Sequence, residues 1–446
     1  MTGRYKTYPE YKDSGSEWVG NIPVQWETTK LKYIFDIQKR IAGEVGYDVL
    51  SITQRGIKVK DIESGDGQLS MDYSKYQLVY KGDFAMNHMD LLTGYVDISS
   101  FDGVTSPDYR VFRLINCTRF YDRYYLYLLQ FCYKQKVFFP LGQGSAHLGR
   151  WRLPTEAFNE VEYPTPSFSE QQQIANFLDY ETAKIDTLID KQEKLIELLK
   201  EKRQAVISHA MTKGLSPDAK MKDSGVEWLG SVPEHWKGTA LKYITNIYGR
   251  IGFRGYTTND IVEEGNGAIT MSPSNISNGV VSFDKATYIS WEKYYESPEI
   301  QLQKDDVVLV KTGSTLGKAG YIDKLICPTT LNPQLAVFKE SSCCNKWLYY
   351  FLNTTLAKAY VNNSNSGGTV PTMSQEKILS YIAPTPPLKE QGEIAAYLDL
   401  EISKIDDLIT KMNTMVDLIN ERKTALISAA VTGKIDVRDW QESEQR

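Results

Sequence analysis

A fifteen-residue phrase occurs twice in the chain, and this repeat constrains the fold more than any other feature. Lys12–Trp26 reads KDSGSEWVGNIPVQW and Lys222–Trp236 reads KDSGVEWLGSVPEHW, with nine identical positions at an offset of 210 residues. The same offset relates the two copies of LKYI, at Leu31–Ile34 and Leu241–Ile244. Self-similarity over such a distance predicts a chain built from two related units.

A second repeat closes each half of the chain, at an offset of 220 residues. PTPSFSEQQQIANFLDYETAKIDTLIDK begins at Pro164, and PTPPLKEQGEIAAYLDLEISKIDDLITK begins at Pro384. The later segments KRQAVISHAMTKG, at Lys202–Gly214, and RKTALISAAVTGK, at Arg422–Lys434, are also similar. The middles, roughly 35–163 and 245–383, barely align. Each unit therefore has a frame of opening and closing repeats that both units share, around a middle whose sequence differs between the units.

The closing repeat has the pattern of a long amphipathic helix. From Ile174 and from Ile394, apolar residues recur at spacings of three and four. The uninterrupted part, 183–211, would be about 43 Å long at 1.5 Å per residue. We expect two such helices to pack antiparallel as a coiled-coil-like pair, although each could instead pack on its own domain. The residues expected to face each other are Leu188, Leu195, Leu199, Leu408, Met415 and Ile419.

Local signals suggest where these helices start and stop. Ser169 with Gln172 offers a capping box at the first start. Glycine suits a helix C-terminus, and Gly214 and Gly433 stand at the two predicted ends. A break near Thr182, and near Ser403 in the second copy, is possible because each could cap a new helix.

The two middles have mixed α and β patterns. The segments 75–87 and 305–313 are strand-like, whereas 122–139 and 345–361 are helix-like and each follows another strand. Loops rich in glycine and serine come next, LGQGSAHLGRWRLP in the first half and NNSNSGGTVPTMS in the second. Binding residues are concentrated on loops that a rigid scaffold positions, so these loops are the natural candidates.

No catalytic constellation is visible in the sequence. GSTLGKA, at Gly313–Ala319, has one residue too few between its glycines for a phosphate loop and lacks the hydroxyl that holds Mg²⁺. LNPQL, at Leu331–Leu335, lacks the second proline and the aromatic residue of an adenine-methylating loop. The four histidines are scattered without ligand spacing. We expect neither a cofactor nor a metal in this chain.

Residues suited to nucleic-acid binding are more evident. Arg, Lys, Asn and Gln read base edges, and Ser, Thr and Lys hold phosphates. For any single residue a solvated turn is an equally good interpretation, so the argument depends on similar loops recurring in both halves. The candidates are Gln143, Ser145, His147, Arg150, Trp151, Arg152, Lys311, Thr312, Ser314, Thr315, Lys318, Asn363, Ser364 and Ser366.

Composition narrows the class of protein. The 446 residues are 41% hydrophobic, and the first 30 contain no apolar run that would predict a secretory signal. Five cysteines without a CxxC pair suit a reducing compartment, so we expect a cytoplasmic location. The net charge of −5 argues weakly against nucleic acid, but a local basic patch can lie on an acidic chain.

The duplicated KDSGxEWxGxxPxxW and EQxxIAxxLDxExxKID closely resemble the specificity subunit of type I restriction-modification systems, and the resemblance covers nearly the whole chain. TLNPQLAVFK and GVTSPDYRVFR also look like segments of that family's variable domains. The resemblance implies a non-catalytic subunit whose variable domains each read one half of a split double-stranded DNA site. It implies two methyltransferase subunits and restriction-translocase subunits as partners, which would carry S-adenosylmethionine, ATP and Mg.

The implied fold is α+β, with two pseudo-twofold-related target recognition domains separated by two long antiparallel helices. The implied boundaries are 1–163 for the first recognition domain, 164–215 for the first helical spacer, 216–383 for the second recognition domain and 384–446 for the second spacer. The N-terminal arm, 1–26, should lie near the end of the C-terminal helix. A stand-alone tandem DNA-binding regulator remains the alternative function.

Overall fold

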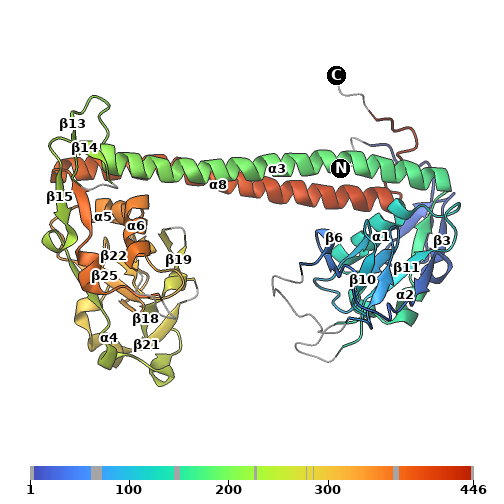
Figure 1. Ribbon diagram of the computed structural model, residues 1–446, viewed down its shortest axis with the longest axis horizontal. Coiled ribbons are helices and arrows are strands. Elements are labelled where there is room, and N and C mark those ends of the chain that lie inside the picture. Colours follow the sequence, from blue (N-terminus) through green and yellow to red (C-terminus); the bar gives the residue numbers. More distant parts are fainter. Residues whose placement is uncertain are drawn as a thin grey trace. The chain divides into compact units, whose positions relative to one another are not determined.

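A computed structural model describes residues 5–61, 73–144, 151–225, 229–277, 279–284, 286–364 and 371–442, apart from the side chains of 253 and 362–364. The chain divides into two compact units (Figure 1). Unit 1 comprises 1–192 and 414–446, and unit 2 comprises 193–413. Each unit therefore contains one variable middle and part of both closing repeats. Within the described residues, no helix is long and apolar enough to cross a membrane.

Unit 1 is built around a four-stranded antiparallel sheet in the order β4-β11-β8-β9. The aromatic rings of Phe35, Phe84 and Phe112, one from each of three neighbouring strands, pack together against helix α1. The elements are β1 (Tyr11–Asp13), β2 (Asn21–Pro23), β3 (Glu27–Lys30), β4 (Phe35–Gln38), β5 (Leu50–Thr53), β6 (Gly56–Val59), β7 (Gln77–Val79), β8 (Phe84–Met86), β9 (Val96–Ile98), β10 (Gly103–Thr105), β11 (Arg110–Leu114), α1 (Asp122–Lys134), α2 (Thr155–Glu160) and β12 (Glu162–Thr165).

Unit 2 contains a sheet with the same arrangement, β16-β25-β22-β23, and a further sheet in the order β17-β21-β18-β24. Its elements are β13 (Met221–Asp223), β14 (Ser231–Pro233), β15 (Lys237–Ala240), β16 (Asn246–Gly249), β17 (Ile261–Val262), β18 (Gly267–Met271), β19 (Ile276–Ser277), β20 (Val280–Val281), β21 (Thr287–Ser290), α4 (Trp291–Tyr295), β22 (Val307–Val310), β23 (Ala319–Tyr321), β24 (Thr329–Leu331), β25 (Leu335–Lys339), α5 (Asn345–Leu352), α6 (Thr355–Ser364), α7 (Gln375–Leu379) and β26 (Ile382–Thr385). The middles that barely align in sequence thus share a sheet topology.

The helical segment predicted over 345–361 is two helices, α5 and α6. Asn353 ends α5, and the hydroxyl of Thr354 accepts a hydrogen bond from the backbone N–H of Ala357 at 3.1 Å. A threonine hydroxyl in this position caps a new helix, so the chain turns between the two helices. The apolar pattern alone does not reveal this break.

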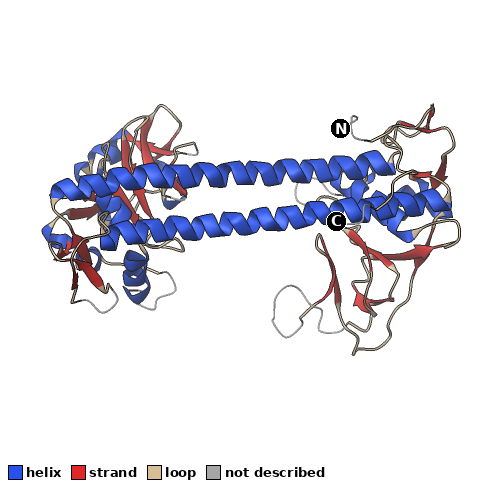
Figure 2. Ribbon diagram, turned by 90° about the horizontal axis from the view of Figure 1, so that it is seen from above, coloured by secondary structure: helices blue, strands red, loops and turns tan. Residues whose placement is uncertain are grey.

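Two long helices carry the closing repeats, α3 (Phe168–Lys213) and α8 (Leu388–Val431) (Figure 2). The 46 residues of α3 span about 69 Å. Both helices continue through Thr182 and Ser403, so the possible break is absent. Ser167, rather than Ser169, caps α3 by accepting the N–H of Glu170 at 3.4 Å.

The C-terminal caps agree with the sequence prediction. Gly214 and Gly433 follow the two helices with φ of 73° and 72°. This left-handed conformation is strained for residues with a side chain, which explains glycine at both ends.

The residues that form the seam between the long helices follow a heptad pattern in each unit. Four of the six predicted seam residues are wrong by one position along the chain. Leu188, Leu195, Leu408 and Met415 are 39–46% exposed, whereas the residues that follow them are less exposed. The apolar residues come in adjacent pairs such as Leu195-Ile196, so spacing alone permits either stripe. At Leu188, Leu195, Leu408 and Met415 the less exposed member of the pair is the β-branched residue that follows, whereas Leu199 and Ile419 themselves lie in the seam. Buried and half-buried positions are Thr182, Ile185, Ile189, Gln192, Ile196, Leu199, Arg203, Val206 and Ala210 on α3, and Ile402, Ile405, Ile409, Met412, Val416, Ile419, Lys423, Leu426 and Ala430 on α8.

Equivalent ion pairs join the two helices within each unit. In unit 1 the Lys423 ammonium contacts both carboxylate oxygens of Asp186, at 2.6 and 2.7 Å. In unit 2 the Arg203 guanidinium contacts both oxygens of Asp406, at 2.8 and 3.3 Å. The partners are related by the 220-residue offset. Asp186, in the first half of α3, meets Lys423 near the end of α8, whereas Arg203, near the end of α3, meets Asp406 in the first half of α8, so the paired segments run antiparallel.

The repeated phrase has a structural role in both units. Trp26 and Trp236 are fully buried. Each indole Nε1 donates a hydrogen bond at 3.0 Å to the carboxylate of the glutamate in the EQ pair, Glu170 or Glu390. In each unit, therefore, the tryptophan comes from the opening repeat and its glutamate partner from the closing repeat, and the same contact occurs twice in the chain.

The N-terminal arm lies against the end of the C-terminal helix in unit 1, as predicted. The backbone N–H of Asp436 donates to the carbonyl of Lys6 at 2.8 Å, and the Tyr11 hydroxyl donates to the carbonyl of Gly433 at 3.1 Å. The Tyr8 hydroxyl donates to Glu170 at 2.6 Å. The arm thus completes the frame of unit 1 next to Trp26.

Candidate nucleic-acid interface

The polar loops that follow the helices of the middles return to the same place in both units. In unit 1 the N–H of Leu153 donates to the carbonyl of His88, just after β8, at 2.9 Å. In unit 2 the N–H of Met373 donates to the carbonyl of Lys311, just after β22, at 2.9 Å. Because β8 and β22 are the third strands of the matching sheets, the described C-terminal ends of the two loops occupy equivalent positions.

In unit 1 the candidate residues differ in what they can contact. Gln143 and Arg152 exchange backbone hydrogen bonds at 2.8 and 3.0 Å, and both side chains are exposed. The Trp151 indole instead donates to the carbonyl of Phe139 at 2.6 Å and stacks on that ring. Trp151 therefore anchors the loop, whereas Gln143 and Arg152 have side chains exposed to a ligand. The candidates Ser145, His147 and Arg150 lie outside the described residues.

Beneath this loop, two buried basic side chains retain unsatisfied polar atoms. Among the residues that the structure describes, His88 Nδ1 and Arg110 Nη1 have no hydrogen-bond partner. Burial, together with the charges of Arg110 and Arg152, lowers the pKa of His88 to about 3, so its imidazole is neutral at neutral pH. Burial also lowers the pKa of Arg110 to about 10. Arg110 Nη2 donates to the carbonyl of Leu153 at 3.0 Å, which ties the loop to β11.

In unit 2 the candidate loop follows β22. Lys311 is half-buried, and burial lowers its pKa. Thr312 forms a backbone bridge with Thr372, which fixes the start of the loop. Ser314 and Thr315 are exposed, and Lys318 is partly exposed. The remaining candidates fall elsewhere: Asn363 and Ser364 end α6 with side chains outside the described part of the chain, and Ser366 lies wholly outside it.

Two further turns, which the sequence candidates omitted, also match between the units. At the start of β11, the N–H of Asp108 donates to the hydroxyl of Ser106 at 3.2 Å. At the start of β25, the N–H of Gln334 donates to the side-chain oxygen of Asn332 at 2.9 Å. Asp108 and Gln334 are exposed, and the carbonyl of Gln334 accepts the N–H of Lys311 at 2.8 Å. The related SPDY and NPQL sequences were the available signal for these turns.

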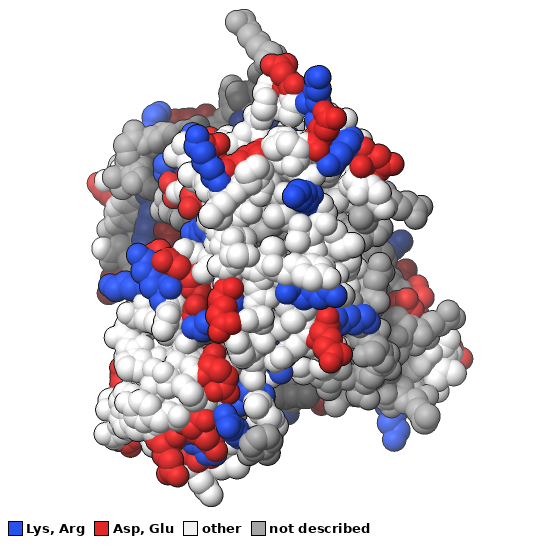
Figure 3. Space-filling model, turned by 90° about the vertical axis from the view of Figure 1, so that its left-hand side faces the viewer, with Lys and Arg blue, Asp and Glu red and all other residues white. Residues whose placement is uncertain are grey.

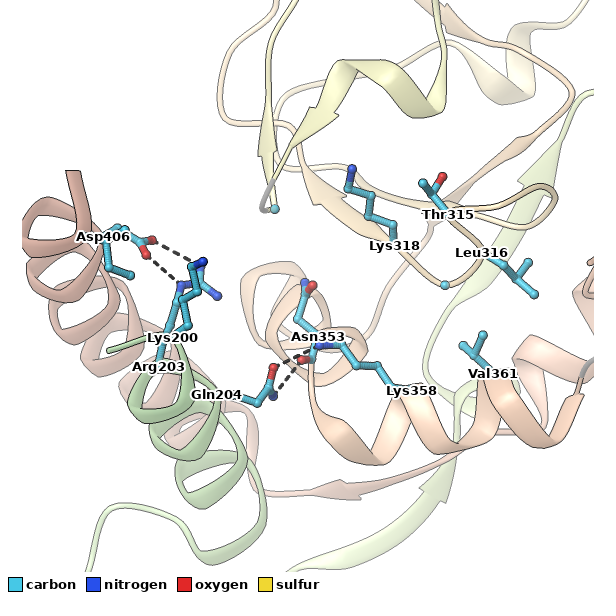
Figure 4. A pocket seen from close by; sticks show the side chains of 13 residues that line it. Lys200, Arg203, Gln204, Thr315, Leu316, Lys318, Asn353, Lys358, Val361 and Asp406 are labelled. Carbon is cyan, nitrogen blue, oxygen red and sulfur yellow. Dashed lines mark hydrogen bonds and ion pairs between the residues drawn. The ribbon is translucent and has the colours of Figure 1, made fainter. Parts of the chain in front are cut away.

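A pocket of about 640 Å³ lies in unit 2, where the long helices meet the variable middle (Figure 4). Its charged lining residues are Lys200, Arg203, Lys318, Lys358 and Asp406. By contrast, the face of the molecule in Figure 3 has lysines and arginines interspersed with acidic residues. The pocket thus concentrates positive charge that neither the composition nor that face displays.

Residues that line the pocket also connect helix α3 to the variable middle by direct hydrogen bonds. Gln204 Nε2 donates to the carbonyl of Asn353 at 3.2 Å, and the Lys358 ammonium donates to Gln204 Oε1 at 3.1 Å (Figure 4). Of these residues, Gln204 belongs to α3 and Lys358 to α6. Across the described ranges, no group of three or more His, Cys, Asp or Glu side chains is placed to hold a metal ion.

Comparison with known proteins gives consistent matches. The family model described as Type I restriction modification DNA specificity domain matches residues 23–198 and again 233–416. The MjaVIII type I restriction enzyme specificity subunit of Methanocaldococcus jannaschii is 24% identical over 303 residues, 67% of this chain and 66% of that protein. The EcoBI type I restriction enzyme specificity subunit of Escherichia coli is 22% identical over 64% of this chain and 60% of its own length. The matches thus span less than two thirds of these relatives.

A solved structure supports the fold at low sequence identity. It comes from a study of complex assembly and conformational transition of the type I R-M system. It superposes with a TM-score of 0.68 at 15% identity, over 93% of this chain and 99% of that one. Because the family model matches twice and covers most of the residues, the chain belongs to the type I restriction-modification DNA specificity domain family.

Proposed function

We propose that this chain is the DNA-specificity subunit of a type I restriction-modification complex. Each variable middle reads one half of a bipartite double-stranded DNA site, and the helix pair sets the spacing and docks two methyltransferase subunits. The observation that carries the proposal is the matched pair of sheets, β4-β11-β8-β9 and β16-β25-β22-β23, each with a returning loop at the same strand end. Two equivalent scaffolds with different loops suit two half-sites of different sequence.

The chemistry of the loops supports recognition without catalysis. They present guanidinium, ammonium, amide and hydroxyl groups, which are the groups that contact base edges and phosphates. S-adenosylmethionine, ATP and Mg would belong to the methyltransferase and restriction-translocase partners. The chain would then work in the cytoplasm as the non-catalytic subunit of the assembly.

Point variants in the two units provide the test. The chain would be coexpressed with its methyltransferase partner, and the methylated sites of the host genome would be sequenced. We expect Arg152→Ala to relax or abolish reading of one half-site and Gln334→Ala to affect the other, since the two residues belong to different units. Trp26→Phe is the control, because its buried contact supports the frame and should leave the remaining methylation at the original sequence. If either loop variant altered both half-sites, the proposed division of labour would be refuted.

A further inference from the structure

The pocket between the long helices and the variable middle of unit 2 has an uneven charge balance. Lys200, Arg203, Lys318 and Lys358 line it, and Asp406 is the acidic residue of the lining. Two of the cations already have carboxylate partners. Arg203 contacts Asp406 at 2.8 Å, and Lys200 contacts Glu197 at 2.9 Å.

The other two cations have no carboxylate partner in the part of the chain that the structure describes. The Lys358 ammonium donates to the neutral amide oxygen of Gln204 at 3.1 Å. Lys318 makes no side-chain hydrogen bond or ion pair within the described residues, and it rises from the loop after β22 (Figure 4). The lining of the pocket therefore includes two ammonium groups without a carboxylate partner among the described residues.

The loop that carries Lys318 adds small hydrogen-bond donors. Gly317 has a φ of 82°, and a Cβ there would lie 2.6 Å from Val361, so only glycine lets the loop pack this closely on α6. Thr315 is exposed beside it and also lines the pocket. The backbone N–H groups of Leu316, Gly317 and Lys318 already donate to carbonyls of the chain, so the lysine ammonium groups and the Thr315 hydroxyl are the donors that this loop offers to phosphate oxygens.

The equivalent place in unit 1 lacks this chemistry. There a pocket of about 540 Å³ is lined by Gln135, Asn420, Glu421, Thr424, Ala425 and Ser428. At the 220-residue offset, Lys200 corresponds to Asn420 and Gln204 to Thr424. Glu421 is the charged residue among these lining residues. Lysines that lack a carboxylate partner among the described residues thus line the unit 2 pocket, whereas no lysine or arginine lines this pocket of unit 1.

We propose that the pocket of unit 2 binds a phosphate group of the DNA backbone, which the proposed function supplies as the ligand. Lys318 and Lys358 contact the phosphate oxygens, and the Arg203–Asp406 pair keeps the floor of the pocket in place. This contact positions one recognition unit on the duplex independently of base sequence, and it makes binding by the two units unequal in salt dependence.

The test measures binding of the full-length protein to a mixed-sequence DNA duplex, by fluorescence anisotropy, over a range of KCl concentrations. The variant is Lys318→Ala with Lys358→Ala. The controls are Asn420→Ala with Thr424→Ala, in the matching pocket of unit 1, and Lys222→Ala, an exposed lysine on β13. Each lost phosphate contact should reduce the slope of log K against log salt by about 0.9, so the double variant should lose about 0.9–1.8.

The controls should keep the wild-type slope. If the double variant kept the wild-type slope of log K against log salt, the proposal would be overturned. If it kept that slope but lost association with the methyltransferase, the occupant of the pocket would be an acidic protein surface and not a DNA phosphate. If the wild-type protein bound no duplex, the proposed function and the DNA phosphate would both be refuted. Inorganic phosphate would then decide about the pocket: stabilisation of the wild type but not of the double variant, measured by thermal unfolding, would assign it to free phosphate, and equal stabilisation would reject it as an anion site.

Discussion

Replacing the glutamate that accepts the buried tryptophan indole in each unit by alanine should destabilise unit 1 more than unit 2. Glu170 is 6% exposed and accepts hydrogen bonds from the Trp26 indole at 3.0 Å and the Tyr8 hydroxyl at 2.6 Å. Glu390 accepts the Trp236 indole at 3.0 Å, and its second contact is with His235, which is 53% exposed. Glu170→Ala thus leaves two buried donors unsatisfied, whereas Glu390→Ala leaves one.

The difference in free energy between the two variants follows from the number of buried hydrogen-bond donors that each leaves without an acceptor. A hydrogen bond to a charged group contributes about 1.5–3 kcal/mol, and an unsatisfied buried donor costs a similar amount. Glu170→Ala should therefore lower the opening free energy of unit 1 by about 3–5 kcal/mol. Glu390→Ala should lower that of unit 2 by about 1.5–3 kcal/mol, because water can replace the carboxylate at the exposed His235.

Hydrogen exchange measured by mass spectrometry separates the two units, because the peptides around Trp26 and Trp236 report on each one. Glu170→Gln is the control, since the amide oxygen keeps one acceptor and should recover a substantial part of the loss. The reasoning is refuted if Glu390→Ala accelerates exchange in unit 2 as much as Glu170→Ala does in unit 1, or if Glu170→Gln behaves like Glu170→Ala.

Two other predictions concern packing and pH. Ile196→Ala should lower the free energy of unfolding by about 2–4 kcal/mol because Ile196 is buried in the helix seam, whereas Leu195→Ala should cost less than about 1 kcal/mol; equal effects in urea denaturation would return the seam to Leu195. The lowered pKa of His88 means that only the unfolded chain takes up this proton between about pH 6.5 and pH 3, so stability is full above pH 6.5 and falls on acidification. From pH 7 to pH 5 the loss attributable to His88 should be about 2 kcal/mol, and it should vanish in His88→Gln but persist in the control at the exposed residue, His209→Gln; an acid limb unchanged by His88→Gln would contradict this.

The parts of the fold that the sequence predicted are those that its repeats encode. The offsets of 210 and 220 residues correctly indicated two units and two long helices, and the repeat placed the N-terminal arm near the end of the C-terminal helix. The seam register was missed by one residue because adjacent apolar pairs such as Leu195-Ile196 satisfy the same spacing. The break at Thr354 was missed because a hydroxyl cap leaves the apolar pattern of the two helices intact.

The candidate site was predicted less completely, for a physical reason. Single loops such as Lys311–Lys318 are contiguous, so their polar residues can be found by reading along the chain. The cationic pocket combines Lys200, Lys318 and Lys358 from three distant segments, and only the folded chain brings them together. The buried Arg110 lies in a strand and His88 directly follows the strand-like segment 75–87, and neither sequence gives a sign of unsatisfied polar atoms.

An exchange of one variable middle tests the central claim most directly. Residues 35–163 would be replaced by the corresponding segment of a relative with a different site, with the closing repeats left unchanged, and the methylated sites of the host genome would be sequenced. The account predicts that one half of the bipartite site changes to that of the relative, while the other half and the gap between them stay as before. A change in both halves, or methylation that keeps the original sequence in full, would contradict it.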